Sequence, residues 1–404
     1  MVAKRPPCGR PRVTRHAIDL FELGRLAKAG GSFDKFALRD GVERQTALVS
    51  VRSRLHADRM ETGTPRMIFP ELDGLGWSMF FAEQLTPADA GLVPARIATV
   101  HRSRPMVETG SGQVRLDPPA HAATTDLAVG DWVLMAPGGQ TALRRLERRT
   151  LLRRRTESAQ TRQLIAANVD TMFIVTSCND DFNVARLERY LALVNEAGIN
   201  AVIVLTKIDQ VDDAGLYRSQ AEALQRDLPV VALNAKASDA AHSLSPWCGP
   251  GQTVALVGSS GVGKSTLLNT LADKAPADAQ LTGNTRKGDE KGRHTTTSRS
   301  LHTIAGGACV IDTPGMRTLH VSDSDAGLDM VYAEIADLAP TCRFRDCTHA
   351  HEPGCAVQAA VKAGDLSAAR LERWRKLRTE NRANTPVLSG PRGNKTPDTR
   401  RRRR

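Results

Sequence analysis

Aromatic residues are scarce in this sequence, since Phe, Trp and Tyr together make up only 4% of its 404 residues. This composition argues against a platform that reads single-stranded nucleic acids by stacking bases on rows of rings. No apolar run approaches the ~18 residues that a transmembrane helix requires. The basic N-terminus also lacks the apolar core of a secretory signal. We therefore expect a cytoplasmic protein with no membrane partner.

Acidic residues are fewer than basic ones. The chain has 56 Lys and Arg against 44 Asp and Glu, which gives a formal net charge of +12. Such an excess favours an anionic partner, of which nucleic acid is the commonest. Cysteine is also sparse, with seven in the chain, but three of them lie close together from Cys342 onward. In a reducing compartment this spacing indicates a metal site before a disulfide.

From about residue 160, apolar runs rich in β-branched residues alternate with helix-like segments. The apolar runs are 172–175, 201–205, 230–233 and 253–257, and the helix-like segments are 184–197, 214–226 and 264–273. This alternation is typical of βαβ units and of a parallel sheet that is covered on both faces. The sequence therefore predicts an α/β domain here.

The preceding stretch, 92–155, has the short strands and Gly-rich turns of a small β-barrel. An Arg-rich run at 144–155 ends it. This run has two interpretations, a surface that contacts phosphate backbones or a solvated charged face. Beyond about residue 320 the chain becomes helical, with a charged helix predicted over 366–384.

A phosphate-binding loop is the clearest motif. Gly258-x4-Gly263-Lys264-Ser265 lies between a predicted strand and a predicted helix, as this motif requires. Backbone amides and the helix N-terminus would hold the phosphates, Lys264 would reach the β- and γ-phosphates, and Ser265 would bind Mg²⁺. The predicted phosphate-contacting residues are Gly258, Ser259, Ser260, Gly261, Val262, Gly263, Lys264, Ser265 and Thr266.

A second magnesium ligand is predicted at Asp312, at the end of another apolar strand. The sequence there reads Asp312-Thr313-Pro314-Gly315. Asp312 would bind Mg²⁺ directly or through water, and the Gly315 amide would contact the γ-phosphate. The motif is weak alone but becomes specific at this distance beyond a phosphate loop.

A run of threonines lies between the phosphate loop and Asp312, where a mobile switch loop is expected. It reads Gly292-Arg293-His294-Thr295-Thr296-Thr297. One of Thr295, Thr296 and Thr297 would coordinate Mg²⁺, and we favour Thr296. Met316 occupies the position of the Gln that orients the attacking water in many small GTPases. Methionine cannot do this, so slow intrinsic hydrolysis is expected, with His294 as a candidate water-positioning group.

Guanine recognition is predicted at Thr206-Lys207-Ile208-Asp209, after a buried strand. The Asp209 carboxylate can accept hydrogen bonds from guanine N1 and the exocyclic amine, a donor pair that adenine lacks. Lys207 would pack along the base, and Thr206 would tie loops together. Asn234-Ala235-Lys236, after the next strand, is similar to the Ser-Ala-Lys element whose backbone amide contacts guanine O6.

The order of these motifs is unusual. In an ordinary small GTPase the base-reading motif comes last, but here it precedes the phosphate loop. Because the termini of a compact domain lie close together, relinking them is physically tolerated. The order therefore predicts a circularly permuted GTPase.

A zinc site is predicted from Cys342-x4-Cys347-x-His349-x5-Cys355. Three thiolates and one imidazole match a closed, structural tetrahedral site, which leaves no position open for catalysis. His351 is a rival to His349 as the fourth ligand.

With these motifs, the chain resembles the ribosome small-subunit-dependent GTPase A family, the circularly permuted GTPases of bacteria. Leu75-Gly76-Trp77 and Gly130-Asp131-Trp132-Val133 add to the resemblance as N-terminal landmarks. It implies an oligonucleotide-binding (OB-like) barrel, a permuted P-loop GTPase core and a C-terminal α-helical zinc domain. It also implies a monomer that binds GTP or GDP, Mg²⁺ and one Zn²⁺, and that acts on the 30S subunit and its 16S rRNA during late maturation.

Five parts of the chain are predicted on this basis. They are a basic, partly disordered extension (1–74), the barrel (75–158), the GTPase domain (159–319), the zinc domain (320–385) and a disordered basic tail (386–404). Two alternatives stay open at this point: a P-loop ATPase, and an RNA-binding assembly chaperone whose nucleotide is mainly structural.

Overall fold

The computed structural model describes residues 69–100, 105–117, 126–156, 159–272, 299–304, 306–313 and 321–385. The chain divides into two units, 1–55 and 56–404, and every described residue lies in the second. The predictions for the extension before residue 69, for the basic tail, for His294 with its three threonines, and for Gly315 and Met316 fall outside the described residues. The predicted limits of the five parts stay predictions.

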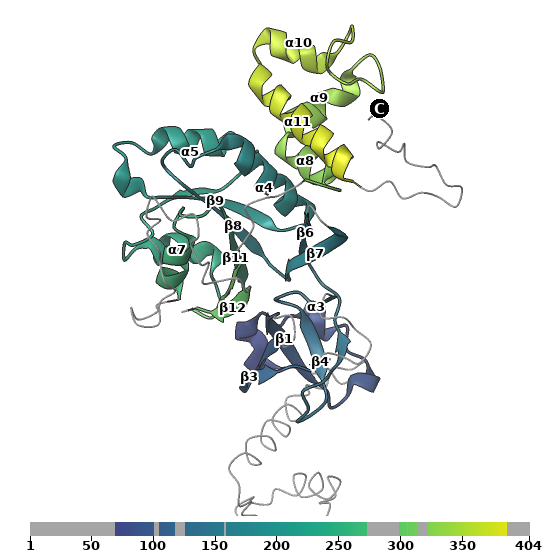
Figure 1. Cartoon of the computed structure of the whole chain (residues 1–404), viewed down its shortest axis with the longest axis vertical. Helices are drawn as coiled ribbons and strands as arrows, with labels where there is room; N and C mark the ends of the chain where they lie inside the picture. Colours follow the sequence, from purple (N-terminus) through teal and green to yellow (C-terminus); the bar gives the residue numbers. More distant parts are fainter. Residues whose placement is uncertain are drawn as a thin grey trace, which may run out of the picture. The chain divides into compact units, whose positions relative to one another are not determined.

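The centre of the structure is a parallel sheet built from the apolar runs (Figure 1). Its strands follow the order β10-β9-β8-β11-β13, and all neighbours in this series pair in parallel. The strands are β8 (Thr171–Ser177), β9 (Asn200–Thr206), β10 (Val230–Ala232), β11 (Thr253–Val257) and β13 (Cys309–Asp312). β12 (Ser300–Thr303) then pairs with β13 antiparallel.

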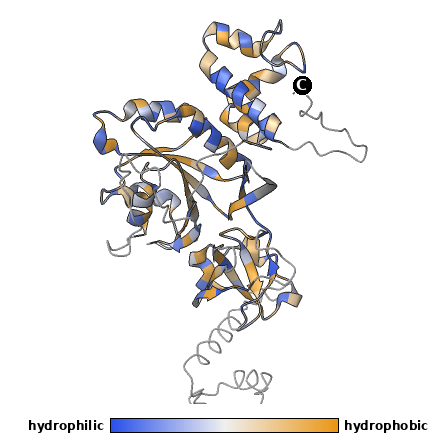
Figure 2. Ribbon diagram, viewed as in Figure 1, coloured by the Kyte–Doolittle hydropathy of each residue, from blue (hydrophilic) through white to orange (hydrophobic). Residues whose placement is uncertain are grey.

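Helices cover both faces of this sheet, because successive strand residues point to opposite sides. Met172 and Ile174 of β8 belong to a cluster with α4 and α5, whereas Phe173 and Val175 belong to a second cluster with α6 and α7. The helices are α4 (Val184–Glu196), α5 (Gly215–Glu222), α6 (Ala240–Leu244) and α7 (Lys264–Leu271), with short 3-10 turns η5 (Ile208–Gln210) and η6 (Ser245–Trp247). Figure 2 shows the hydrophobic colouring concentrated on the central strands.

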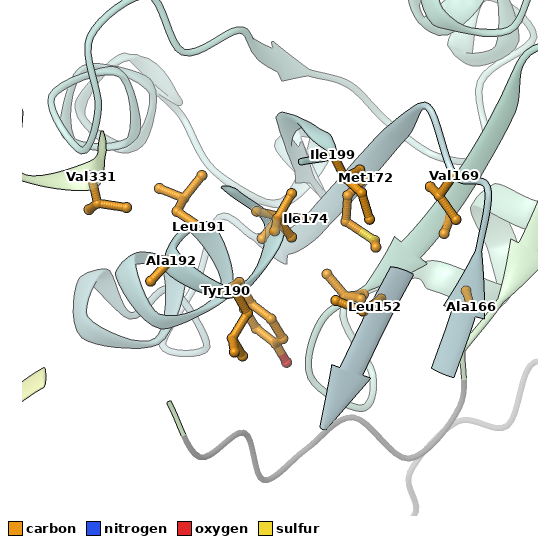
Figure 3. Packing of buried hydrophobic residues seen from close by; sticks show 14 of the residues in the cluster. Leu152, Ala166, Val169, Met172, Ile174, Tyr190, Leu191, Ala192, Ile199 and Val331 are labelled. Atoms are coloured by element: carbon orange, nitrogen blue, oxygen red, sulfur yellow. The ribbon is translucent and has the colours of Figure 1, made fainter. Parts of the chain in front are cut away.

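Figure 3 shows part of the first cluster at close range, with Met172 and Ile174 of β8 beside Tyr190 and Leu191 of α4. Leu152, which lies outside the GTPase strands, joins the same cluster. This continuous core explains why the strands read as uninterrupted apolar runs in the sequence.

The N-terminal β region is an antiparallel sheet of five strands in the order β3-β2-β1-β4-β5. They are β1 (Val93–Thr99), β2 (Met106–Thr109), β3 (Gly112–Arg115), β4 (Trp132–Met135) and β5 (Ala142–Arg145), preceded by η2 (Pro70–Leu75), α3 (Met79–Ala82) and η3 (Pro87–Asp89). A bridge between Asp117 and Thr141 joins the two edges and closes the sheet. We call β1–β5 with these short helices the barrel.

A two-stranded hairpin, β6 (Leu151–Thr156) and β7 (Ala159–Ala167), follows the barrel and forms a separate sheet. The Arg-rich run therefore extends from β5 into β6. Three of its members form ion pairs: Arg144 with Asp89, Arg148 with Asp131, and Arg149 with Asp170. Arg148 holds the fully buried Asp131 with two hydrogen bonds of 2.6 and 2.7 Å. Part of the run is thus structural, and it is not a uniform phosphate-binding face.

The C-terminal part consists of α8 (Asp325–Val331), α9 (Ala333–Leu338), η7 (Ala339–Thr341), α10 (Ala356–Ala363) and α11 (Ala368–Asn384). α11 begins two residues later than the predicted 366 and ends where the sequence predicts. Its Arg370 and Arg373 pair with the fully buried Glu188 of α4. None of the helices in the described part of the chain combines the length and the apolar character that a membrane crossing requires.

Residues near the C-terminal end of α11 form hydrogen bonds with the segment that precedes α8. Glu380 accepts a hydrogen bond from the Val321 amide (3.0 Å) and pairs with Arg189 of α4. Asn381, which is buried, accepts from the Ser324 amide (3.0 Å). One helix therefore contacts both the GTPase core and the segment that follows β13.

Candidate functional site

The predicted nucleotide-binding residues converge on one edge of the parallel sheet. In parallel strands the carboxyl ends share an edge, and ligands of open α/β sheets bind there. β9 ends at Thr206, β11 at Val257 and β13 at Asp312, and β10 ends two residues before Asn234. The base-reading motif, the phosphate loop and the predicted magnesium ligand therefore lie at the same edge, although they are far apart in the sequence.

The phosphate loop connects β11 to α7 and has the backbone geometry that its glycines allow. Gly258 has φ +145°, and a Cβ atom there would lie 2.1 Å from the carbonyl oxygen of Val175. Gly263, at the start of α7, has φ +98°. The Nζ of Lys264 donates to the carbonyl oxygens of Gly258 (2.9 Å) and Ser259 (2.5 Å), so its charge lies over the loop.

Two hydrogen bonds join the phosphate loop and its helix to the base-reading loops. The buried Thr206 hydroxyl donates to the carbonyl oxygen of Val262 at 2.5 Å. The Thr270 hydroxyl of α7 donates to the carbonyl oxygen of Ala235 at 2.7 Å. These contacts place the two walls of the predicted guanine nucleotide site next to each other.

The base-reading residues are accessible at this edge. Lys207 adopts a left-handed conformation (φ +59°) and is half-buried, as is Ile208, whereas Asp209 is exposed. The Asn234 side chain accepts a hydrogen bond from the Lys236 amide at 3.0 Å, which shapes the second loop. A carboxylate in this setting is free of burial and is available to accept hydrogen bonds from a base.

Asp312 lies beside the phosphate loop, because β13 pairs with β11 and places Asp312 opposite Leu256. Asp312 is buried, and the adjacent Thr313 donates from its hydroxyl to the Leu256 carbonyl oxygen at 2.6 Å. Ser265, the other predicted magnesium ligand, is in the first turn of α7 and half-buried. This hydrogen bond of Thr313 to the strand of the phosphate loop is not predictable from the sequence, because a hydroxyl directly after a strand is a common feature.

The cysteine cluster comes together as the spacing predicts. The metal-binding atoms of Cys342, Cys347, His349 and Cys355 all lie within 4.8 Å of one another. The Nδ1 atom of His349 is 3.5 Å from the sulfur atoms of both Cys342 and Cys355. Tetrahedral zinc with bonds of about 2.0–2.3 Å would separate its ligand atoms by about 3.3–3.8 Å. The residues therefore fit zinc, and His349 rather than His351 is the fourth member.

Side chains from α10 and α11 support this cluster. Gln358 donates to the His349 carbonyl oxygen at 2.6 Å, Arg375 donates to the same oxygen, and the Trp374 ring lies 5.5 Å from the imidazole. Burial lowers the pKa of His349, and the nearby Arg378 lowers it further. A neutral imidazole is the form that binds a metal. Sequence reasoning missed these supports, because nothing in the local pattern links residues 374 and 375 to position 349.

Comparisons with known proteins agree with this arrangement. A model of the family described as RsgA GTPase matches residues 145–322. A small ribosomal subunit biogenesis GTPase RsgA from Mesorhizobium japonicum is 62% identical over 335 residues, which cover 83% of this chain and 97% of the relative. The chain belongs to the RsgA GTPase family. A second relative, RsgA 2 of Vibrio parahaemolyticus, is 45% identical over 79% of this chain and 88% of its own length.

Solved structures show the same fold in more distant proteins. YjeQ from Thermotoga maritima matches with a TM-score of 0.54 at 24% identity, over 72% of this chain and 98% of its own. YloQ, described as a circularly permuted GTPase, matches with a TM-score of 0.51 at 22% identity, over 75% of this chain and 99% of its own. The predicted family and the predicted permuted fold are therefore confirmed, and the chain is a GTPase. A P-loop ATPase is set aside.

Proposed function

We propose that this RsgA-family GTPase binds the small (30S) ribosomal subunit and hydrolyses GTP during its late maturation, with hydrolysis stimulated by the subunit. The observation that carries the proposal is the 62% identity to the Mesorhizobium japonicum small ribosomal subunit biogenesis GTPase across 97% of that protein. The matched stretch of 335 residues is about twice as long as the predicted GTPase core, so the similarity extends well beyond that core.

The edge of the sheet supports a specific division of roles. Residues 258–266 would wrap the phosphates of GTP or GDP, and residues 206–209 with 234–236 would hold the guanine. Ser265, Asp312 and Thr296 would bind Mg²⁺, which would neutralise charge on the phosphate oxygens when bound. The hydrogen bond from Thr206 to the Val262 carbonyl oxygen supports this division, because it ties the base side to the phosphate side.

The residue at position 316 gives a reason why hydrolysis would need the subunit. Met316 stands where a water-orienting Gln is common, and Met cannot orient water. We propose that His294 takes over this task and that contact with the 30S subunit brings it to the attacking water. Intrinsic hydrolysis would then be slow, and contact with the correct particle would accelerate it.

The cysteine cluster and the charge of the chain support a ribosomal RNA partner. We propose one structural Zn²⁺ at Cys342, Cys347, His349 and Cys355, contact with 16S rRNA by the barrel and the zinc domain, a monomeric state and a cytoplasmic location. The net charge of +12 favours phosphate contact. Arg343 and Arg345 are exposed between two of the cysteines and are placed to take part.

State-dependent binding tests the proposal. Sedimentation with purified 30S particles should retain the chain in the presence of a non-hydrolysable GTP analogue and release it with GDP. A Lys264→Ala variant, which lacks the phosphate-loop charge, should lose this difference. Equal retention in both nucleotide states, with no multiple-turnover hydrolysis when 30S is added, would support the remaining alternative, an RNA-binding chaperone whose nucleotide is structural.

A further inference from the structure

A buried arginine lies where the barrel meets the GTPase core. Arg96 is in the middle of β1 between Ala95 and Ile97, and only 1% of its surface is exposed. Burying a guanidinium costs several kcal/mol unless its N–H groups are satisfied. Burial also lowers the pKa of Arg96. We therefore expect hydrogen bonds of Arg96 that an apolar side chain could not form.

The hydrogen bonds of Arg96 reach both parts of the molecule. On the barrel side, Nε donates to the Gly130 carbonyl oxygen (3.3 Å) and Nη1 donates to the Leu75 carbonyl oxygen. On the core side, Nη1 donates to the Thr253 hydroxyl (2.9 Å) and Nη2 to the Asn168 carbonyl oxygen (3.1 Å). Thr253 is the first residue of β11. The planar, five-donor fork of arginine suits such a hub, whereas lysine would not reach all four acceptors.

The two N-terminal landmarks converge on this side chain. Leu75 and Gly130 supply acceptors, and the Trp132 ring lies 5.8 Å from the guanidinium carbon. Gly76 has φ +82°, and a Cβ atom there would lie 2.8 Å from Arg96 Nη1 and 2.9 Å from the Gly251 carbonyl oxygen. Leu75-Gly76-Trp77 and Gly130-Asp131-Trp132 are thus explained as parts of one junction.

Strand pairing alone would hold the barrel to the core weakly. β1 pairs with β12 through one residue pair, Thr99 with Ser300. Around Arg96 the junction adds an amide hydrogen bond from Ala167 to the Val129 carbonyl oxygen (2.8 Å) and a bond from the Asn168 side chain to the Gly130 carbonyl oxygen (2.9 Å). Arg96 bonds to acceptors on both sides of this junction, next to the Asn168 side chain and the Arg149–Asp170 ion pair.

The junction is connected to the nucleotide site by two short routes. β11 begins at Thr253 and ends at the phosphate loop. Ser300, which pairs with Thr99 of the barrel, pairs on its other side with Asp312. At about 4.8 Å per strand, Thr99 is therefore ~10 Å from the predicted magnesium ligand.

We propose that Arg96 is a positioning residue for GTP hydrolysis: it makes the barrel and the GTPase core one rigid unit, so that engagement of the barrel by the 30S subunit is transmitted to β12, β13 and Asp312. The proposal rests on the proposed function, because it needs a 30S subunit that stimulates hydrolysis. Arg96 contacts neither nucleotide nor metal in this account, and it acts through Thr253 and β1.

The sharpest variant is Thr253→Val, which keeps the shape of the buried side chain and removes only the hydroxyl that Arg96 binds. GTP turnover is measured with and without saturating 30S, together with the affinity for 30S. We expect intrinsic kcat and KM and the 30S affinity to change by less than about threefold, while the stimulation by 30S falls about fivefold or more. Thr253→Ser, which restores the hydroxyl, should recover the stimulation.

A second pair of variants tests rigidity without the ribosome. Arg96→Met should raise amide hydrogen exchange in the barrel strands and also in β12 and β13. Arg148→Met is the matched control, because the Arg148 side chain is largely buried too, but its partners in the described part of the chain, Asp126 and Asp131, lie on the barrel side. It should raise exchange in the barrel alone.

The outcomes separate this inference from the proposed function. Wild-type stimulation in a folded Thr253→Val variant would overturn the transmission role of Arg96. A wild-type protein that 30S does not stimulate would refute the proposed function instead, and unchanged exchange of β12 and β13 in Arg96→Met would then overturn the rigid junction as well. If Arg96→Met does not fold, the comparison of Thr253→Val with Thr253→Ser still tests the transmission role of Arg96.

Discussion

Asp209 is the residue on which we expect the choice of base to depend. It is exposed at the edge where the phosphate loop lies. Asp209→Asn should weaken mant-GTP binding about a hundredfold, because two hydrogen bonds to a charged acceptor are lost at roughly 1.5 kcal/mol each. Binding of xanthosine triphosphate should strengthen, since xanthine carries a carbonyl where guanine carries the amine. Nucleotide titrations measure both.

The exposed neighbour Asp212 supplies the control. Asp212→Asn removes the same charge from the same loop and should leave the affinity for mant-GTP within about twofold. Equal affinities of the wild type and Asp209→Asn for GTP would show that Asp209 does not contact the base.

Glu352 shapes the cysteine cluster without belonging to it. Its carboxylate accepts hydrogen bonds from the amides of Thr348 (2.8 Å), Ala350 (2.9 Å) and His351 (3.1 Å). The hydroxyl and the amide of Thr348 hold the pKa of Glu352 well below its ordinary value. Glu352→Gln should speed the release of zinc to a chelator about tenfold, as for other groups that orient metal ligands. A colorimetric zinc indicator follows the release.

Asp346→Asn is the matched change in the same loop, where Asp346 is exposed. It should release zinc at the wild-type rate. If Glu352→Gln and Asp346→Asn behave alike, the Glu352 carboxylate does not orient the cluster.

Individual functional residues can be predicted from the sequence when they belong to a local motif. Lys264, Asp209 and the four predicted metal ligands belong to motifs of this kind, because their expected chemistry requires a fixed spacing. Arg96 and Thr253 could not be paired, since 157 positions separate them and neither belongs to a motif. The sequence offers one indication of the role of Arg96, its position between Ala95 and Ile97 in an apolar strand. This position indicates a buried polar partner but does not identify it.

The helix α11 contacts three separate parts of the structure. It holds Glu188 of α4 through Arg370 and Arg373, the segment before α8 through Glu380 and Asn381, and the zinc loop through Arg375. The sequence predicts its helical character from charge and length. Its partners could not be predicted, because the sequence of a charged helix has the same pattern whether its arginines face water or a buried carboxylate.

Glu188→Gln tests the attachment of α11 to α4. Glu188 is fully buried, and the loss of its charge leaves Arg373 without a carboxylate and Arg370 with Glu334 alone. We expect the free energy of unfolding to fall by about 3 kcal/mol. Glu222→Gln breaks an exposed pair within α5 and should cost less than about 1 kcal/mol. Chemical denaturation of both variants gives the comparison, and equal stabilities would contradict a structural role for the Glu188 pairs.

For the molecule as a whole, the order of the motifs predicts the permuted fold, because three motifs can serve one nucleotide only if their strands end at one edge. The sheet that continues from β12 into β1 was not predictable, since a single pair, Thr99 with Ser300, joins strands from distant parts of the chain. The limits of the five predicted parts also remain predictions, and the predicted boundary after 158 falls between the paired strands β6 and β7.

Binding to the 30S subunit should depend steeply on salt. If barrel and zinc domain bind rRNA by phosphate contacts, the affinity should fall about a thousandfold between about 50 and 200 mM salt. Sedimentation with 30S across this range measures the slope, and GTP affinity of the protein alone, measured in the same buffers, is the control. A flat response would show that phosphate contacts do not dominate.

The most direct test of the account is GTP turnover measured in parallel with purified 30S, 50S and 70S particles. We expect slow hydrolysis by the protein alone and a large acceleration by 30S that 50S does not reproduce. Hydrolysis that is unchanged by 30S, or accelerated equally by 50S, would contradict it.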